Sequence, residues 1–354
     1  MPVEPVGPSA LDAFIELPFS LHADDPAWVP PLRQSIRTEL DGSSPFFRYG
    51  RAQAFVTSLA GHLRGRIAAL MNDRLVEADG APIGQVGYFE CVDEPDVARD
   101  LFAAAFDWLR AAGARRVIGP MNGGVHRSHR LLVRGFERSP FLLEPRNPEH
   151  YPRRFAEAGF SPIASWCSLD TTRIDHARLR TRFSRLARGR FTVELPDPTD
   201  VPAVLTRLYP LLDRVWGDHF GYARIEPEEL AGVMGPILPF MRRGELWFLR
   251  DPSGADLGYA MCYPDLAPEV RALGGDASGW GRWAPRLDAR LVLHTVALVP
   301  EVRGTRGTFQ MVAQGIQAGL ADGIEEHVWA LLVQPSMPQL FRDTREYSLY
   351  GRPL

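Results

Sequence analysis

The sequence predicts a mixed α/β protein built from two related sheets. Strand segments with alternating apolar residues occur in hairpin-like groups, and each half of the chain also contains helices with apolar residues three and four apart. The order of strand hairpin, further strand, helix, strand, helix and strand occurs twice. A strand, helix, strand connection in a sheet of mixed direction places the chain in the α/β or α+β class. With 354 residues the chain is long enough for two cores, which we expect at 1–170 and 171–354.

The first half contains a strand hairpin and an amphipathic helix. Strands are predicted at Gln53–Leu59 and Leu63–Met71, on either side of a short turn. A helix is predicted over 96–112, where apolar residues recur at helical spacing and Gly113 provides a C-cap. The other expected elements are a helix at 10–21, a proline-rich extended segment at Asp24–Leu32, strands at Gln85–Glu90, Arg115–Ile118 and Ser161–Leu169, and a helix at 148–158.

The second half contains the most strand-like segment of the chain, Leu291–Val299. Its mainly aliphatic composition is typical of a strand that is covered on both faces. A helix with apolar residues from Phe309 to Leu320 follows and ends at Gly323. The other expected elements are helices near 199–216 and 226–242, strands at Glu245–Arg250, Leu257–Tyr263 and His327–Val333, a loop at 264–287, a short helix and a last strand at Glu346–Tyr350.

The charged residues exclude several classes of protein. All 40 basic residues are arginines, because the sequence contains no lysine. A Schiff-base enzyme needs an amine that can deprotonate, and a P-loop nucleotidase needs the lysine of its phosphate loop, so both classes are excluded. The net charge of −3 gives no global attraction to nucleic acid or to an anionic membrane, and we expect neither as a partner.

The cysteines and the N-terminus indicate a reducing compartment. Cys91, Cys167 and Cys262 are odd in number and widely spaced, which favours neither a disulfide framework nor a zinc site. The first residues lack the basic and apolar regions of a signal peptide, and no stretch approaches the ~20 apolar residues of a membrane helix. We therefore expect a cytoplasmic protein.

The segment Leu298–Thr308 runs from the most strand-like segment into the following helix. The first N–H groups of a helix are unpaired and its dipole is positive there, so such a turn can hold an anion such as a pyrophosphate. Arg303 and Arg306 would add positive charge. An ordinary strand-to-helix turn with two solvated arginines fits the same spacing.

This segment resembles motif A of the GCN5-related N-acetyltransferase (GNAT) superfamily. In that family a V-x-P-like strand end is followed by [RQ]-x-x-G-x-[GA] and a helix, and the loop amides bind the pyrophosphate of acyl-coenzyme A. Arg303 and Gly304 match the opening of the pattern, whereas Arg306 stands at the glycine position and Thr308 at the Gly or Ala position. Gly307 can compensate for one of these losses. The resemblance implies a donor site formed by Leu298, Val299, Arg303, Gly304, Arg306, Gly307 and Thr308.

Further segments resemble a bacterial group of tandem GNAT-like proteins over nearly the whole chain. They are DDPAWVPPLR, GYFECVDEPDVA, GPMNG, FLLEPRNPEHYPRRFAEAGF and YSLYGRPL. The resemblance implies a tandem GNAT-like acyl-CoA N-acyltransferase fold. It also implies that the first unit is degenerate, because no R-x-x-G-x-G follows its helix-preceding strand. The donor site would then lie in residues 171–354.

Acyl transfer from a thioester to an amine needs a base, a polarised carbonyl and an acid for the thiolate. The resemblance places the polarising backbone amide near Leu298. His294 lies on the same strand, and its residue type titrates near neutrality, so it is the candidate base. A buried, hydrogen-bonded histidine is the alternative. The resemblance also suggests Tyr347 and Tyr350 as candidates for the thiolate acid, although edge-strand packing explains either tyrosine equally well.

Other charged residues suggest sites less specifically. His126 and His129 have helical spacing, but no third ligand is evident and arginines flank them, so we expect no metal. Glu90 and Asp265 could bind an acceptor ammonium or be solvated carboxylates. The segment Arg173–Arg190 holds seven arginines and one acid, as in a solvated basic face. Its functional alternative is to dock an acyl carrier protein or the 3′-phosphate of a coenzyme.

The sequence therefore predicts an acyltransferase with acyl-CoA as co-substrate and a small-molecule amine as acceptor. An acyl carrier protein is the alternative donor. The competing hypothesis is a catalytically degenerate GNAT-fold protein that binds a ligand or a partner, because Arg306 and Thr308 depart from the family pattern.

Overall fold

The computed structural model describes residues 1–170, 177–178, 181–182, 185, 191–280, 291–308, 310–311, 313–314, 327–332 and 344–354. These residues form two compact units. Unit 1 comprises Met1–Ser165, residues 267–280 and Arg345–Leu354, and unit 2 comprises the described residues of 166–266 and 291–344. Two segments that the sequence suggested for the second domain, the one after Leu266 and the C-terminal strand, thus belong to unit 1.

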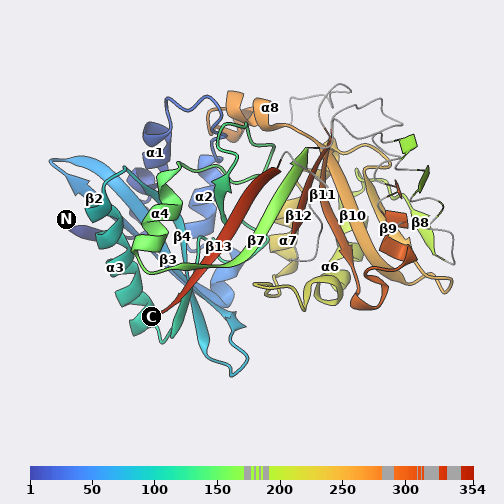
Figure 1. Ribbon diagram of the computed structural model, residues 1–354, viewed down its shortest axis with the longest axis horizontal. Helices are drawn as coiled ribbons and strands as arrows, with labels where there is room; N and C mark the ends of the chain where they lie inside the picture. The colour runs from blue at the N-terminus through green and yellow to red at the C-terminus, as the bar shows by residue number, and fades with distance from the viewer. Residues whose placement is uncertain are drawn as a thin grey trace. The chain divides into compact units, whose positions relative to one another are not determined.

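Unit 1 is built on a sheet that is antiparallel except for one parallel pair, β4 with β5 (Figure 1). The hairpin β2–β3 turns at Ala60 and Gly61, both of which have positive φ angles. The strand order is β1-β2-β3-β4-β5-β13, and β6 also pairs with β13. The strands are β1 (Val3–Val6), β2 (Gly50–Leu59), β3 (His62–Val76), β4 (Pro82–Cys91), β5 (Arg116–Gly119), β6 (Leu131–Arg134) and β13 (Thr344–Pro353).

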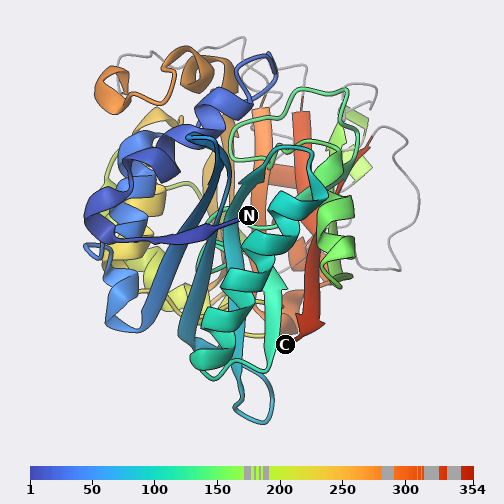
Figure 2. The same ribbon diagram turned by 90° about the vertical axis from the view of Figure 1, so that its left-hand side faces the viewer.

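Helices cover both faces of this sheet (Figure 2). Alternation along β3 sends Ile67 and Ala69 to one core and Ala68 and Leu70 to the other, as expected for a strand buried on both sides. The first core includes residues of α3 and α4, and the second includes residues of α1 and α2. The helices are α1 (Asp12–Leu21), α2 (Arg33–Leu40), α3 (Pro95–Ala111), α4 (His150–Glu157) and the short α8 (Ala267–Ala272).

Unit 2 repeats the hairpin, helix and parallel strand of unit 1. Its strand order is β7-β12-β11-β10-β9-β8, and β11 pairs antiparallel with β10 and parallel with β12. The helix after β11 begins at Arg306. The elements are β7 (Ser161–Asp170, of which the part from Trp166 belongs to this unit), β8 (Thr192–Glu194), α6 (Val201–Trp216), α7 (Pro227–Met234), β9 (Leu246–Arg250), β10 (Asp256–Pro264), β11 (Leu291–Leu298) and β12 (His327–Leu332).

The predicted class, a mixed α/β protein with mixed sheets, is confirmed. The predicted helix at 226–242 is shorter, because α7 ends at Met234 just before Pro236. The predicted loop at 264–287 contains α8 in its described part. The end of the predicted helix at 309–323 and the short helix after Val333 lie outside the described residues. No helix in the described part of the chain is long and apolar enough to cross a bilayer.

Candidate functional site

The central strand of unit 2, β11, is irregular at His294. On the β10 side, Met261 pairs with Thr295 and Cys262 with Leu293, so His294 is the extra residue of a β-bulge. On the β12 side, the described pairing covers only Leu291 to Leu293. Beyond the bulge, β11 pairs with β10 alone among the described residues. The candidate base His294 thus lies where the described pairing of β11 with β12 ends.

His294 itself is half-buried at this bulge. Its Nδ1 lies 2.8 Å from the Thr295 hydroxyl oxygen, and its ring centroid lies 5.4 Å from that of Tyr263. The adjacent hydroxyl can fix the orientation of the imidazole. The position suits a proton acceptor, and the catalytic role stays a prediction.

The turn after β11 is closed by its own hydroxyl groups. Thr308 Oγ1 accepts a hydrogen bond from Gly304 N at 2.9 Å, and Thr305 Oγ1 accepts one from Gly307 N at 3.2 Å. Both hydroxyls also donate to the carbonyl oxygen of Val302. Two amides that the resemblance assigns to donor phosphates are therefore directed to threonines of the same turn.

Glycine is required at two positions of this turn for different reasons. Gly304 has a φ of +68°, which side chains rarely adopt. Gly307 is buried at the helix start, and a Cβ there would lie 2.9 Å from Cδ2 of Leu249 on β9. Gly307 thus permits close packing of the helix on the sheet, which differs from the compensating role in the loop that the sequence suggested.

The side chain of Arg303 connects the turn to α6 by hydrogen bonds and an ion pair. Its guanidinium forms an ion pair with both carboxylate oxygens of Asp218, at 2.5 and 2.8 Å. It also donates to the carbonyl oxygens of Leu298 at 2.9 Å and Val215 at 2.8 Å. The hydrogen bond to Asp218 raises the pKa of Arg303, although burial opposes this change. The charge of Arg303 is thus paired within the protein, and the expected contact with phosphate stays a prediction.

We expect Arg303→Ala to weaken binding of a coenzyme A thioester by about 1.5–3 kcal/mol, measured by calorimetry. The variant removes the contacts of the turn with Asp218 and Val215, so we expect the loss to come from a less ordered turn, and Asp218→Asn should then weaken binding too. Tighter binding in Asp218→Asn would instead mean that Arg303, once released, contacts the phosphates directly.

Unit 1 has a similar bulge, but its own chain fills the open edge. Tyr88 on β4 has a φ of +51°, and the parallel pairing with β5 ends at Gln85. Beyond that point, Tyr88 N donates to Asn122 Oδ1 at 3.0 Å and Cys91 N donates to the Tyr151 hydroxyl at 3.0 Å. The backbone N–H groups of Tyr88 and Cys91 are therefore occupied by side chains of the same unit.

Comparison with known proteins decides the fold. No family model matches the sequence. A tandem GNAT protein from the clavulanic acid biosynthesis pathway matches the structure with a TM-score of 0.53 and 14% identity, over 99% of this chain and 98% of that chain. A probable N-acyltransferase from Enterococcus faecalis V583 matches with a TM-score of 0.55 and 12% identity, over 99% of this chain and 72% of that chain. The chain has the GNAT fold.

Two curated proteins are similar in sequence. Protein YghO from Escherichia coli K12 is 26% identical over 306 residues, which cover 85% of this chain and 77% of that protein. A bacterial ceramide synthase from Caulobacter vibrioides is 27% identical over 315 residues, which cover 87% of this chain and 81% of that protein. Both likenesses cover most of the GNAT-fold chain.

The two tyrosines suggested for the thiolate acid lie in unit 1, whereas His294 lies in unit 2. Tyr347 is 1% exposed, and its hydroxyl donates to the Glu144 carboxylate, which also accepts from Arg345. Tyr350 packs against Phe155, and burial raises the pKa of its phenol. Both side chains belong to the packing of unit 1, and no described contact supports the suggested role.

Glu90 on β4 lies at the centre of a network of hydrogen bonds and charges. The spacing of these residues in the sequence does not predict this network. Its carboxylate accepts from His22 Nε2 at 2.7 Å and from the Tyr151 hydroxyl at 2.6 Å, and Arg66 lies 3.9 Å away. Burial alone would raise the pKa of Glu90, but the hydrogen bonds and the charges of His22 and Arg66 outweigh it and lower this pKa. Neither Glu90 nor the buried Asp265 is a solvated carboxylate.

The two histidines considered as metal ligands lie in a loop of unit 1. His129 Nδ1 lies 2.9 Å from the carbonyl oxygen of Arg127, and His129 bridges to Met121. Burial and the charge of Arg127 lower the pKa of His126 to about 3. Within the described residues, no three His, Cys, Asp or Glu side chains are grouped as metal ligands.

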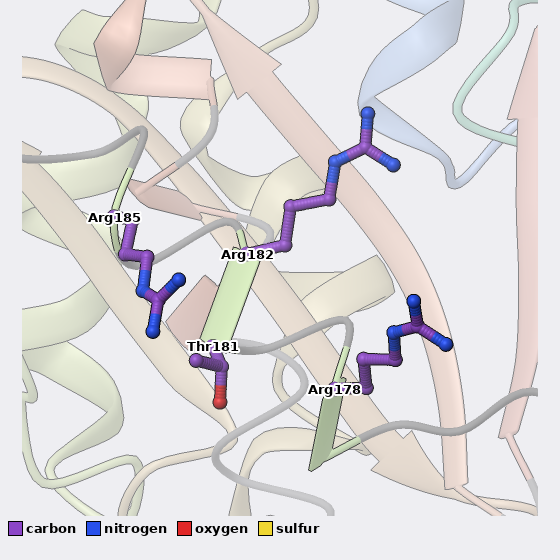
Figure 3. A pocket seen from close by; sticks show the side chains of 4 residues that line it. All are labelled: Arg178, Thr181, Arg182 and Arg185. Atoms are coloured by element: carbon purple, nitrogen blue, oxygen red, sulfur yellow. The ribbon is translucent and has the colours of Figure 1, made fainter.

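The arginine-rich segment of unit 2 borders a cavity of about 570 Å³ (Figure 3). Arg178, Thr181, Arg182 and Arg185 line it. Their spacing of three, one and three residues places them on one helical face, and the described residues there are helical and exposed. This is the described part of the basic run that the sequence singled out.

Proposed function

We propose that the protein transfers an acyl group from an acyl-coenzyme A thioester to the amino group of a long-chain amine. The amide C–N bond forms and the thioester C–S bond breaks. The acceptor ammonium gives up two protons, of which the leaving thiolate takes one and solvent the other. The observation that carries the proposal is the half-paired, bulged strand β11 that leads directly into a helix start within a GNAT fold.

Three parts of unit 2 have separate roles in the proposed reaction. His294 accepts a proton from the acceptor ammonium. The backbone of β11 between His294 and Leu298 polarises the thioester carbonyl, and the turn from Val299 to Thr308 binds the donor phosphates. The filled edge at Tyr88 supports a single donor site, in unit 2.

The name of the Caulobacter relative supports the class of acceptor. A ceramide is an N-acylated long-chain amino alcohol, so a long-chain amino alcohol is the acceptor that the likeness suggests. The three free cysteines fit a reaction in the cytoplasm. An acyl carrier protein remains the alternative donor.

The proposal is tested by amide formation with a panel of substrates. Purified protein is incubated with acyl-CoA and either a long-chain amino alcohol or a short soluble amine, and mass spectrometry quantifies amide and free thiol. We expect equimolar amide and thiol with the long-chain acceptor. Thioester loss without amide, or equal rates with both amines, would contradict the proposed acceptor class. A reaction only with acyl carrier protein would contradict the donor.

The closed turn favours a second function, ligand binding without catalysis. The observation that favours this function is that the backbone N–H groups of Gly304 and Gly307 donate to threonine hydroxyls rather than facing outward. A protein that has lost coenzyme binding could keep its turn in this closed form.

Thr305→Ala combined with Thr308→Ala separates the two functions. The double variant frees both amides, so we expect acyl-CoA to bind several-fold more tightly while the free energy of unfolding falls by about 1 kcal/mol. Thr206→Ala, which removes a threonine hydrogen bond on α6, is the control. Donor binding by the variant but not by the wild type would support the degenerate protein. Unchanged affinity for acyl-CoA would show that these two amides do not bind the donor.

A further inference from the structure

Residues 267–280, here called the strap, lie between two strands of unit 2 in the sequence but belong to unit 1. The strap follows β10, which ends at Pro264, and precedes β11, which begins at Leu291. Figures 1 and 2 show its helix α8 next to the loop that follows α1. The two strands that carry Tyr263 and His294 are therefore joined through a segment that the other unit holds.

The first attachment of the strap is to the proline-rich segment Asp24–Leu32. Arg271 donates from Nε to the carbonyl oxygen of Trp28 at 3.1 Å and from Nη2 to that of Ala27 at 3.2 Å. The indole of Trp28 packs edge-on against Phe19, with ring centroids 5.3 Å apart. The motif DDPAWVPPLR, which the proposed reaction does not use, thus has a partner within the protein.

Arg33, the first residue of α2, makes the second attachment. Its backbone N–H donates to the carbonyl oxygen of Gly275 at 3.0 Å, and its Nη1 donates to that of Gly274 at 2.5 Å. The same guanidinium forms an ion pair with Glu16 of α1, and its Cζ lies 3.6 Å from the centroid of the Phe19 ring. Gly275 has a φ of +86°, and a Cβ there would lie 2.5 Å from the Phe19 ring. Only glycine fits this contact.

The strap begins almost directly after β10, so its position limits that of the strand end. The link consists of Asp265 and Leu266, which are both buried, and Ala267 of the strap is buried too. Such a link has little slack. Tyr263, the residue before the last of β10, has its ring centroid 5.4 Å from that of His294. A displaced strap would therefore shift the ring against which His294 packs.

We propose that docking of the strap on unit 1 positions the end of β10, and through Tyr263 the imidazole of His294, for acyl transfer. The inference rests on the proposed function, in which His294 accepts a proton from the acceptor ammonium. Arg33 and Gly275 are then positioning residues, because they lie in unit 1 and act through the strap. A shift of a reacting group by ~1 Å can lower a rate about 100-fold, so contacts far from the reacting atoms can determine turnover.

Two pairs of matched variants test this inference. Gly275→Ala introduces the clash with the aromatic ring, whereas Gly274→Ala also strains a positive φ but meets no other part of the protein within 4 Å. Arg33→Gln removes the guanidinium that binds the strap, whereas Arg37→Gln removes only the neighbouring ion pair between α1 and α2. We expect Gly275→Ala and Arg33→Gln to speed hydrogen exchange in the strap and to lower kcat by about tenfold, with donor affinity unchanged. The two controls should stay within about twofold of the wild type.

The NMR signal of the His294 ring provides a readout that does not depend on activity. It is assigned with His294→Gln, and the nearby Tyr263 ring makes it sensitive to the position of β10. We expect this signal to shift in Gly275→Ala and Arg33→Gln but not in the controls. Faster exchange in the strap with an unchanged His294 signal or an unchanged kcat would overturn the inference, while the acyltransferase proposal stands. Unchanged exchange in the strap of both variants would overturn it too. If the wild type forms no amide, the proposed function fails, and the His294 signal still decides whether the strap positions this residue.

Discussion

Replacing His294 with glutamine should lower the turnover of acyl transfer by about 10²–10⁴, with donor affinity almost unchanged. Glutamine keeps hydrogen bonding and approximate volume but cannot accept a proton. His294 is the bulged residue of β11, at the point where the described pairing with β12 ends. A base there can take a proton from the acceptor ammonium, and the resulting neutral amine can then attack a carbonyl bound along the same strand.

The pH profile gives this variant a signature of its own. An unperturbed histidine titrates near pH 6.5, and its protonated form cannot act as a base. If His294 is the base, the wild-type rate should fall toward acid pH, and this acid limb should vanish in His294→Gln. Thr295→Val, which removes only the hydroxyl partner of Nδ1, should cost much less and keep the limb. Turnover within a few-fold of wild type would make His294 a structural residue.

Replacing Glu90 with alanine should reduce the free energy of unfolding by about 3–5 kcal/mol, measured in urea. The variant leaves the buried Arg66 and His22 without their carboxylate, and Tyr151 loses its acceptor. Glu94→Ala is the matched control, because Glu94 forms a more exposed ion pair with Arg64 and should cost less than about 1 kcal/mol. Equal effects of the two variants would show that the network contributes no special stability.

Acid should reduce the stability that the Glu90 network provides. The pKa of Glu90 is lower in the folded protein than its ordinary value. Its contribution to stability is therefore complete above the ordinary pKa of a glutamate and is lost as the pH falls through the depressed value. The unfolding free energy of the wild type should decrease more steeply with acidification than that of Glu90→Ala. Parallel pH curves would contradict the depressed pKa.

The fold was predictable where local patterns and burial agree. Alternation around Ala60 and Gly61 predicts the β2–β3 hairpin, and the aliphatic run predicts β11. The short strand β1 contains Pro5 and too few residues for a periodic signal. The strand β13 was predicted as an element, but its place in unit 1 depends on pairing with β5, which is distant in sequence.

The site was predictable only as a position along the chain. The strand-to-helix turn follows from the sequence, but the partners of its side chains do not. Arg303 pairs with Asp218, which is 85 residues away, and no spacing rule links them. The Glu90 network joins His22, which directly follows α1, to residues of β3 and α4, so it exists only once the sheet has formed. A threonine at position 308 signals a departure from motif A, yet only the structure reveals the hydrogen bond that it accepts.

Hydrogen exchange measured with and without acyl-CoA tests the central claim most directly, because it locates the donor on the chain. The account predicts that the donor slows exchange in the segment from Leu298 to Thr308 of unit 2 and leaves the β4–α3 junction of unit 1 unchanged. Protection at β4–α3, or none at Leu298–Thr308 despite donor binding, would contradict the donor site in unit 2.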